Sequence, residues 1–180
     1  FILSIGLRPF VELSFTPQDM ASVADRTVYS APFNVSPPKD VARWTSLVSA
    51  FLEHVIARYS LQEVRRWEFS VWNEPDTGTT LFGFDSDREF REFYRATYLA
   101  VKSVDSRIRV GSPSMLVSYT QEKTWMLGFL EYARTHQCPP DFLTIHYYDN
   151  DFTWDSLPEH TPGNPSSSRL NKDQESFSRT

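Results

Sequence analysis

The sequence predicts an α/β fold in which parallel strands alternate with helices. Short apolar runs typical of strands are separated by longer segments in which apolar residues recur every three or four positions, as in helices that pack on a sheet. Such alternation favours parallel strands joined by right-handed crossovers. Of the 180 residues, 40% are hydrophobic and 15% aromatic, which is enough for the core of one globular unit.

The first half of the chain contains two predicted strands and the clearest helix. An apolar run at residues 7–15 is the first strand. A Pro-Pro-Lys-Asp sequence at residues 37–40 opens a helix whose apolar side chains share one face, predicted to pack on the sheet: Val41, Trp44, Leu47, Val48, Phe51, Leu52, Val55, Ile56 and Tyr59. The second strand starts at Trp67 and stops at or near Glu74, because Pro75 cannot donate to a sheet ladder.

The second half continues the alternation. Ser86, with Glu89 three positions later, forms a capping box at the start of a helix. We then expect a short strand at residues 108–111, a helix at 125–134 and a strand at 142–147. Four strands with intervening helices therefore account for most of the chain.

The charge pattern argues against several classes of partner. The formal net charge is −5 without long runs of one sign, so the sequence has no basic stripe for nucleic acid and no polybasic patch for a membrane surface. No apolar span of 18 residues predicts a membrane helix. The single cysteine, Cys138, and the lack of a leader favour a soluble, cytoplasmic protein, but the N-terminus looks cut and the location stays unknown.

Several other chemistries have no support in the sequence. It contains no Gly-x-Ser-x-Gly elbow, no phosphate-binding glycine-rich loop, no His-Glu-x-x-His zinc pair and no paired cysteine motif. We therefore expect no metal and no cofactor.

A Trp-Asn-Glu-Pro sequence places a carboxyl group where the second strand stops. The carboxyl ends of parallel strands are where loops gather into a site. Shelter beside Trp72 disfavours the charged form of the Glu74 carboxyl group, which suits a general acid. Asn73 offers a donor and an acceptor to a polyhydroxylated ligand. From these residues alone, a carboxylate that caps a helix or pairs with an arginine is an equally good interpretation.

Two further strand ends carry polar residues. His146 and Tyr148 are two positions apart, so both side chains fall on one face of the fourth strand. From the residues alone, a hydrogen-bonded histidine in a turn beside a structural tyrosine is the better interpretation. Glu12 ends the first strand and is either another carboxyl group of the same site or a partner in a structural ion pair with an arginine.

Six segments, in this order, make the chain similar to glycoside hydrolase family 39, the β-xylosidase and α-L-iduronidase family: residues 6–17 (GLRPFVELSFTP), 34–40 (NVSPPKD), 72–75 (WNEP), 100–105 (AVKSVD), 109–113 (RVGSP) and 141–148 (DFLTIHYY). The resemblance spans roughly residues 5–150 and implies a TIM (β/α)8 barrel. Residues 1–180 would be an incomplete part of its catalytic domain, with about strands three to six. The bacterial β-xylosidases are the most similar branch, whereas Asp76 is typical of the iduronidase branch.

The resemblance also implies a reaction and roles for residues. It implies a retaining O-glycoside hydrolase acting on a xyloside or related carbohydrate, with Glu74 as the general acid/base. Asn73 would hydrogen-bond the sugar 2-hydroxyl, and His146 and Tyr148 would belong to the sugar pocket, which reverses the interpretation from the residues alone. The family's nucleophile is a second glutamate at the end of strand seven, in a motif that this chain does not contain. We therefore expect the chain alone to be inactive.

Two other interpretations stay open. A partial barrel leaves both lateral sheet edges unpaired. Either further segments of the full protein close the barrel, or copies of the chain cover these edges in a homo-oligomer. The alternative function is that of a non-catalytic carbohydrate-binding or assembly fragment, which kept Asn73, His146 and Tyr148 but lost turnover. Weak sugar binding without hydrolysis would favour this alternative.

Overall fold

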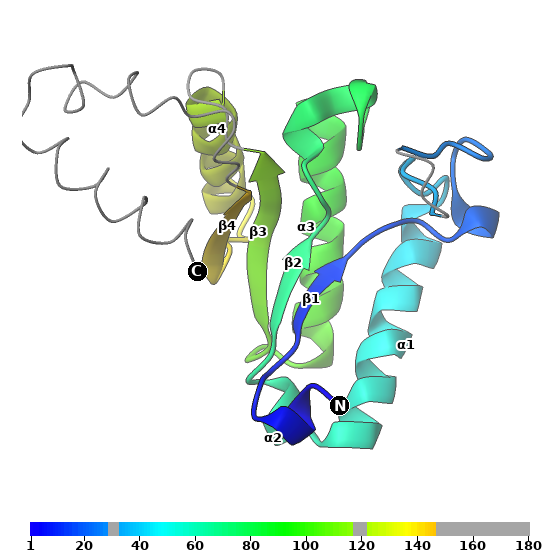
Figure 1. Cartoon of the computed structure of the whole chain (residues 1–180). Coiled ribbons are helices and arrows are strands. Elements are labelled where there is room, and N and C mark those ends of the chain that lie inside the picture. Colours follow the sequence, from blue (N-terminus) through cyan, green and yellow to red (C-terminus); the bar gives the residue numbers. More distant parts are fainter. Residues whose placement is uncertain (29–32, 117–121, 147–180) are drawn as a thin grey trace, which may run out of the picture. The chain divides into compact units, whose positions relative to one another are not determined.

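The structure of the chain is a computed structural model that describes residues 1–28, 33–116 and 122–146, all within one compact unit, Phe1–His146. In this described part the strands are β1 (Phe10–Leu13), β2 (Glu68–Val71), β3 (Arg109–Leu116) and β4 (Phe142–His146). They form one sheet in the order β1-β2-β3-β4, and every neighbouring pair is parallel (Figure 1). The predicted α/β fold with parallel strands is confirmed.

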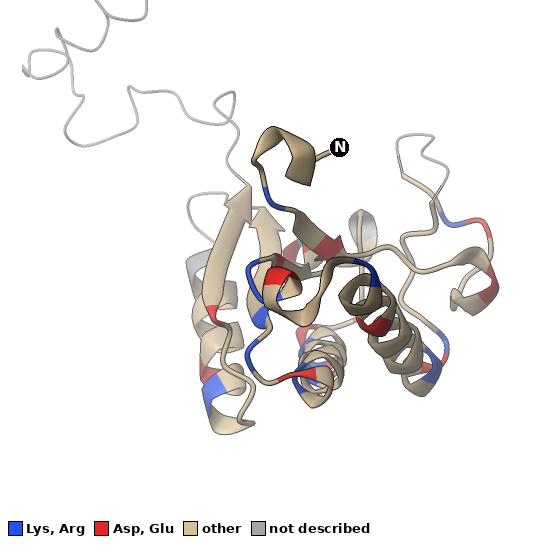
Figure 2. Cartoon of the chain, turned by 90° about the horizontal axis from the view of Figure 1, so that it is seen from below, with Lys and Arg blue, Asp and Glu red and all other residues tan. Residues whose placement is uncertain are grey.

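The helices connect successive strands and lie together on one face of the sheet (Figure 1). The described helices are α1 (Val41–Tyr59), α2 (Leu61–Val64), α3 (Asp87–Val104) and α4 (Glu122–Thr135), with 3-10 turns at Leu3–Ile5, Gln18–Met20 and Pro75–Thr80. Acidic and basic residues are interspersed along the helices (Figure 2). Among the described residues, no helix is long and apolar enough to cross a membrane.

Side-chain caps define where the two long helices begin. The Asp40 carboxylate accepts hydrogen bonds from the backbone N–H groups of Ala42 and Arg43 at the start of α1. At the start of α3 the Ser86 hydroxyl accepts from the N–H of Glu89, whose own carboxylate accepts from the N–H of Asp85. These bonds satisfy N–H groups that have no partner within the helix. The predicted helix start at Ser86 and its cap are confirmed, whereas the Glu89 carboxylate accepts from the residue before the cap instead of from Ser86.

The core fills the space between the sheet and the helices. Trp72, which is fully buried, lies at its centre and makes edge-to-face contacts with four rings: Phe15, Trp44, Phe84 and Phe93. Val71 and Phe69 of β2 reach the same cluster, so alternate residues of that strand point toward the helices. The residues between them point to the opposite face of the sheet.

Three predicted strands have other bounds in the structure. The second strand covers Glu68–Val71 and ends three residues before Glu74, because Trp72 has a positive φ angle of 72° that leaves the extended conformation. The first strand covers only Phe10–Leu13 instead of residues 7–15, and a 3-10 turn at Leu3–Ile5 precedes it. The third strand is longer than the predicted 108–111, since it continues to Leu116. Pro113 looks like a strand end in the sequence, but it lies where the β3–β4 register shifts between Gly111 and Ser114, so no regular ladder bond is required of it.

The predicted apolar face of α1 is only partly covered. Trp44, Val48, Leu52 and Val55 are buried, whereas Val41, Leu47 and Tyr59 are about 40% exposed. The reason is that β1 is an edge of the described sheet, so nothing described covers the outer flank of α1. At the other edge, Leu143 and Ile145 of β4 are about half exposed.

The sheet curves around the face opposite the helices. In a flat sheet the edge strands β1 and β4 would lie roughly 14 Å apart, three strand spacings. Yet the rings of Phe10 and Phe142, one from each edge strand, are only 6.0 Å apart and meet edge to face. The Arg109 guanidinium of β3 lies 5.2 Å from the centre of the Phe142 ring. Curvature of this kind is expected for a segment of a barrel wall.

Candidate active site

The concave face of the sheet carries a row of polar side chains. Glu12 of β1 pairs in register with Ser70 of β2, and both point away from the helices because their neighbours belong to the core. Across β3 and β4 the row continues through Ser114, paired with Thr144. The Ser70 and Ser114 hydroxyl oxygens are 3.4 Å apart, and those of Ser114 and Thr144 are 3.5 Å apart. A layer of hydroxyl groups thus lies beneath the strand ends.

A second layer closes the amino-terminal end of this face. It consists of Phe10, Glu68, Arg109 and Phe142, in which Glu68 and Arg109 form an ion pair across β2 and β3. Side chains stacked in layers inside a curved parallel sheet are typical of a barrel interior, which is packed rather than open. The carboxyl ends of the strands lie at the other end of the concave face, where loops of parallel α/β proteins gather into a site.

Glu74 lies at the carboxyl ends of the strands, three residues after β2. The backbone of Glu74 is anchored to β3, because its N–H donates to the Ser114 carbonyl oxygen at 2.7 Å and Asn73 forms a parallel bridge with Ser114. Trp72 and Glu74 both have positive φ angles, 72° and 43°. This conformation is uncommon for residues other than glycine and often occurs at functional sites.

The Glu74 carboxyl group meets His146 from the end of β4. The distance between His146 Nδ1 and Glu74 Oε1 is 2.8 Å, which is a hydrogen bond. Glu74 is buried, with 6% of its surface exposed, whereas the His146 side chain is 32% exposed. One proton lies between the two groups, either on the carboxyl oxygen or on the imidazole nitrogen. The pair thus brings together two ionisable groups that are 72 positions apart in the chain.

Glu12 belongs to the same end of the concave face. Its Oε1 accepts a hydrogen bond from the Ser14 hydroxyl at 2.9 Å. Burial raises the pKa of the Glu12 carboxyl group, and the Glu74 carboxylate raises this pKa further. Hydrogen bonds from the Ser14 and Ser114 hydroxyls and the electrostatic effect of the His146 imidazole lower it. Within the described part of the chain Glu12 forms no ion pair with an arginine. Of the two interpretations open from the sequence, the structure supports a carboxyl group of the site.

Of the other two residues predicted for the site, the structure describes one. Asn73 directly precedes Glu74 and is half buried at the bridge to β3. Tyr148 lies outside the described residues. Asp76, whose identity bears on the branch of the family, accepts a hydrogen bond from the Leu116 N–H at 3.1 Å and so ties the turn after Glu74 to the end of β3.

Sequence reasoning missed Ser14 and Ser114 as neighbours of the acidic groups. The i, i+2 spacing of Glu12 and Ser14 at a strand end was a usable signal, since it resembles that of His146 and Tyr148. Nothing comparable marked Ser114, because its place beside Glu74 depends on how β2 and β3 pair.

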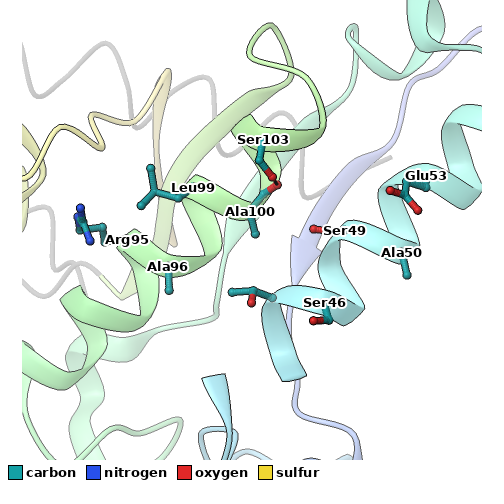
Figure 3. Close-up of a pocket in the computed structure, with 10 residues that line it drawn as sticks. Ser46, Ser49, Ala50, Glu53, Arg95, Ala96, Leu99, Ala100 and Ser103 are labelled. Atoms are coloured by element: carbon teal, nitrogen blue, oxygen red, sulfur yellow. Dashed lines mark hydrogen bonds between the residues drawn. The ribbon is translucent and has the colours of Figure 1, made fainter. Parts of the chain in front are cut away.

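A separate groove of about 680 Å³ runs between the outer sides of α1 and α3 (Figure 3). It is lined by Thr45, Ser46, Ser49, Ala50, Glu53, Arg95, Ala96, Leu99, Ala100 and Ser103. None of the residues predicted for the site reaches it. The carboxyl and imidazole groups gather instead at the strand ends, which we take as the candidate active site.

Parallel strands, crossover helices, a curved sheet and ionisable side chains at the carboxyl strand ends are features of (β/α)8-barrel proteins. The chain belongs to glycosyl hydrolases family 39, whose family model matches residues 1–175. The expected resemblance and the fold, an incomplete (β/α)8 barrel, are confirmed.

Two similar relatives are β-xylosidases. The chain is 39% identical to that of Geobacillus stearothermophilus over 149 residues, covering 81% of the chain and 28% of the relative. It is 35% identical to that of Caldicellulosiruptor saccharolyticus over 154 residues, covering 86% of the chain and 30% of the relative. The crystal structure of a monomeric β-xylosidase from Caulobacter crescentus CB15 matches with a TM-score of 0.72 at 35% identity, covering 82% of this chain and 28% of that one. The chain thus spans less than a third of the length of these relatives.

Proposed function

We propose that this chain is part of a retaining, β-xylosidase-like O-glycoside hydrolase in which Glu74 is the general acid/base. The hydrogen bond of 2.8 Å between the buried Glu74 carboxyl group and His146, at the carboxyl ends of the strands, carries this proposal. A carboxyl group held by a hydrogen bond at a strand end is suitably placed to pass a proton to a ligand bound there. The names of the two β-xylosidase relatives support the choice of substrate class.

In the proposed first step, Glu74 transfers its proton to the glycosidic oxygen while the bond from that oxygen to the anomeric carbon breaks. A carboxylate nucleophile, supplied from outside this chain, bonds to the anomeric carbon and forms a glycosyl ester. In the second step Glu74, now ionised, takes a proton from water, the water oxygen bonds to the anomeric carbon, and the ester bond breaks. Glu74 thereby regains its proton and the nucleophile is released.

Three other residues have roles in this proposal. His146 orients the Glu74 carboxyl group through the hydrogen bond to Oε1. Asn73 hydrogen-bonds the 2-hydroxyl of the sugar, a contact that its position directly before Glu74 supports. Tyr148 contributes to the sugar pocket.

The acid/base role of Glu74 is tested with two substrates whose leaving groups differ in how much they need a proton to depart. In a protein that carries this segment together with the remaining strands of the barrel, Glu74→Gln is expected to lower kcat/KM on an alkyl β-xyloside by about 10²-fold or more. The loss on an activated nitrophenyl β-xyloside should be much smaller, because nitrophenolate leaves without a proton. Glu53→Gln, on the exposed side of α1, is the control and should leave both rates unchanged. Equal losses on the two substrates would refute the assignment.

The source of the nucleophile is tested with the 180-residue chain alone. We expect no release of nitrophenol from nitrophenyl β-xyloside. Turnover that both Glu74→Gln and Glu12→Gln abolish would instead place the second carboxylate within this chain, at Glu12. A complete barrel that binds xylose weakly but hydrolyses neither substrate would favour the alternative of a carbohydrate-binding or assembly fragment.

A further inference from the structure

The turn that follows Glu74 holds the backbone of this residue. The Glu74 carbonyl oxygen accepts two hydrogen bonds from Thr77, one from its backbone N–H at 3.1 Å and one from its side-chain hydroxyl at 2.7 Å. The first bond belongs to the turn and would form with any residue that has a backbone N–H. The second bond requires a hydroxyl group. Thr77 therefore makes a contact with Glu74 that depends on its side chain.

The Thr77 hydroxyl is itself part of a short chain of hydrogen bonds. Its oxygen accepts from the Phe82 N–H at 3.4 Å, and the Phe82 carbonyl oxygen accepts from the Trp72 indole N–H at 2.7 Å. Trp72 is fully buried in the core and lies two residues before Glu74. The contacts thus run from the core through Phe82 and Thr77 to the backbone of Glu74.

These contacts act on an uncommon backbone conformation. Glu74 has a φ of 43° and a ψ of 50°, in the left-handed region that residues with a Cβ atom rarely adopt. Its N–H donates to the Ser114 carbonyl oxygen at 2.7 Å, and its C=O is held by Thr77.

The two peptide groups that flank the Glu74 Cα atom set the direction of its side chain, whose carboxyl group meets His146 at 2.8 Å. Loss of the Thr77 hydroxyl would weaken the anchor on one of these peptide groups. The Glu74 backbone would then be freer to leave the left-handed region, because such a conformation persists only where surrounding contacts maintain it.

Other contacts hold the turn as a whole in place. Arg26, in the segment between β1 and α1, donates from its guanidinium group to the carbonyl oxygens of Thr79 and Gly83. The Asp76 carboxylate accepts from a backbone N–H at the end of β3 at 3.1 Å. Since none of these contacts involves the Thr77 hydroxyl, we expect the chain to fold without it.

We propose that Thr77 is a positioning residue for the general acid/base. This inference rests on the proposed function of Glu74. The Thr77 hydroxyl holds the Glu74 backbone in the left-handed conformation, which directs the carboxyl group toward the glycosidic oxygen that leaves the sugar. Thr77 acts through Glu74 and not on the substrate. A displaced acid slows the reaction, because proton transfer requires hydrogen-bond distance to the oxygen that receives the proton.

The test measures kcat/KM in an active protein that carries this segment together with the remaining strands of the barrel. Thr77→Val removes the hydroxyl and keeps the branched shape. We expect it to lower kcat/KM on an alkyl β-xyloside by about tenfold. The loss on a nitrophenyl β-xyloside should be less than about twofold, because nitrophenolate leaves without a proton.

Two further variants separate the hydroxyl group from other effects of the substitution. Thr77→Ser restores the hydroxyl and should regain most of the rate lost on the alkyl β-xyloside. Thr79→Val is the matched control, since Thr79 belongs to the same turn but has an exposed side chain, and it should leave both rates unchanged.

Circular dichroism and urea unfolding establish that each variant is folded. If Thr77→Val does not fold, Thr77→Ala takes its place with the same expectations, since alanine also lacks the hydroxyl and brings no methyl group against the Glu74 carbonyl oxygen. Failure of both variants to fold would overturn the inference, because the hydroxyl would then serve the fold and not the site.

Equal losses of Thr77→Val on the two substrates would also overturn the inference, because a purely structural effect lowers both rates alike. Unchanged rates, or a serine variant that regains nothing, would do the same. Failure of the proposed function appears elsewhere, as equal losses in Glu74→Gln on alkyl and nitrophenyl xylosides. Leaving-group dependence in Glu74→Gln without any in Thr77→Val refutes only the role of Thr77.

Discussion

The backbone around Glu74 has an unfavourable local conformation that tertiary contacts maintain. Trp72 and Glu74 both have positive φ angles, which cost on the order of 1 kcal/mol or more for residues with a Cβ atom. Two hydrogen bonds of 2.7 Å hold this segment: the Trp72 indole N–H donates to the Phe82 carbonyl oxygen, and the Glu74 N–H donates to that of Ser114. The turn toward His146 therefore depends on anchors outside the tetrapeptide.

The half-buried Glu12 carboxyl group is expected to make the stability of the chain depend on pH. Burial raises the pKa of this carboxyl group above its ordinary value of 4.5, so the folded chain binds its proton more tightly than the unfolded chain does. The contribution of Glu12 to stability is fully present below pH 4.5 and is lost as the pH rises through the raised pKa. We expect Glu12→Gln to be more stable than the unchanged chain at pH 7, and this advantage to shrink at pH 4. Urea unfolding at the two pH values measures the difference.

Glu53→Gln is the matched control, because Glu53 is exposed on α1 and its substitution should leave the pH dependence unchanged. An advantage of Glu12→Gln that is equal at both pH values would contradict the argument, since it would reflect packing instead of the charge.

At the scale of elements, the close approach of β3 and β4 depends on a residue without a side chain. A Cβ atom at Gly111 would lie 2.3 Å from the Phe142 ring, well inside the contact distance. Phe142 also touches Phe10 across the concave face and lies under the Arg109 guanidinium. Gly111 therefore contributes to the packing of the second layer, at the amino-terminal end of the concave face, and to the curvature of the sheet.

Gly111→Ala is accordingly expected to lower the free energy of unfolding by about 1–3 kcal/mol, the usual range for overpacking. Gly128→Ala in α4 is the matched control. Its new Cβ would meet only the end of the flexible Arg91 side chain at 2.8 Å, and alanine is the better helix former by up to about 1 kcal/mol. Urea unfolding of both variants gives the comparison. Equal stability of Gly111→Ala and the unchanged chain would show that the Phe142 ring moves aside without cost.

At the scale of the whole molecule, both edges of the described sheet leave apolar groups uncovered. Leu143 and Ile145 of β4 are 51% and 52% exposed, and Leu47 on the α1 flank beside β1 is 41% exposed. Sheet edges with exposed apolar side chains favour association with another chain. In the solved relatives this segment is about a third of the chain or less, so other strands are available there to cover such edges.

We expect the isolated 180-residue chain to have a mass above the 20.9 kDa of one copy when measured by light scattering after gel filtration. Replacing Leu143 and Ile145 by lysine should lower that mass, because the charges oppose the approach of a second copy. Lysine at the exposed positions Ser46 and Ala57 of α1 is the control and should not change it. A mass of one copy for the unchanged chain would contradict the expectation of a homo-oligomer.

The sequence alone determined the elements and the type of fold. α1 and α3 begin where Asp40 and Ser86 predict, because a cap is a contact between neighbours in the chain. Helical periodicity likewise reflects local geometry, and alternation of strands and helices leaves few arrangements other than a parallel sheet. Glu74 was recognisable as a candidate because Pro75 indicates that the strand stops before it and because the surrounding motifs match a known family.

Only the tertiary structure decided which polar groups meet. Glu74 and His146 are 72 positions apart, and their bond exists because β2 and β4 flank β3 in a curved sheet. Strand pairing likewise places Glu12 in register with Ser70 on the face of the sheet opposite the helices, and within the described residues Glu12 forms no ion pair with an arginine. The edge position of β1 explains why part of the apolar face of α1 is exposed, because β1 has no neighbour on its outer side in the described sheet. Strand pairing and curvature arise from contacts between distant segments, which local patterns do not encode.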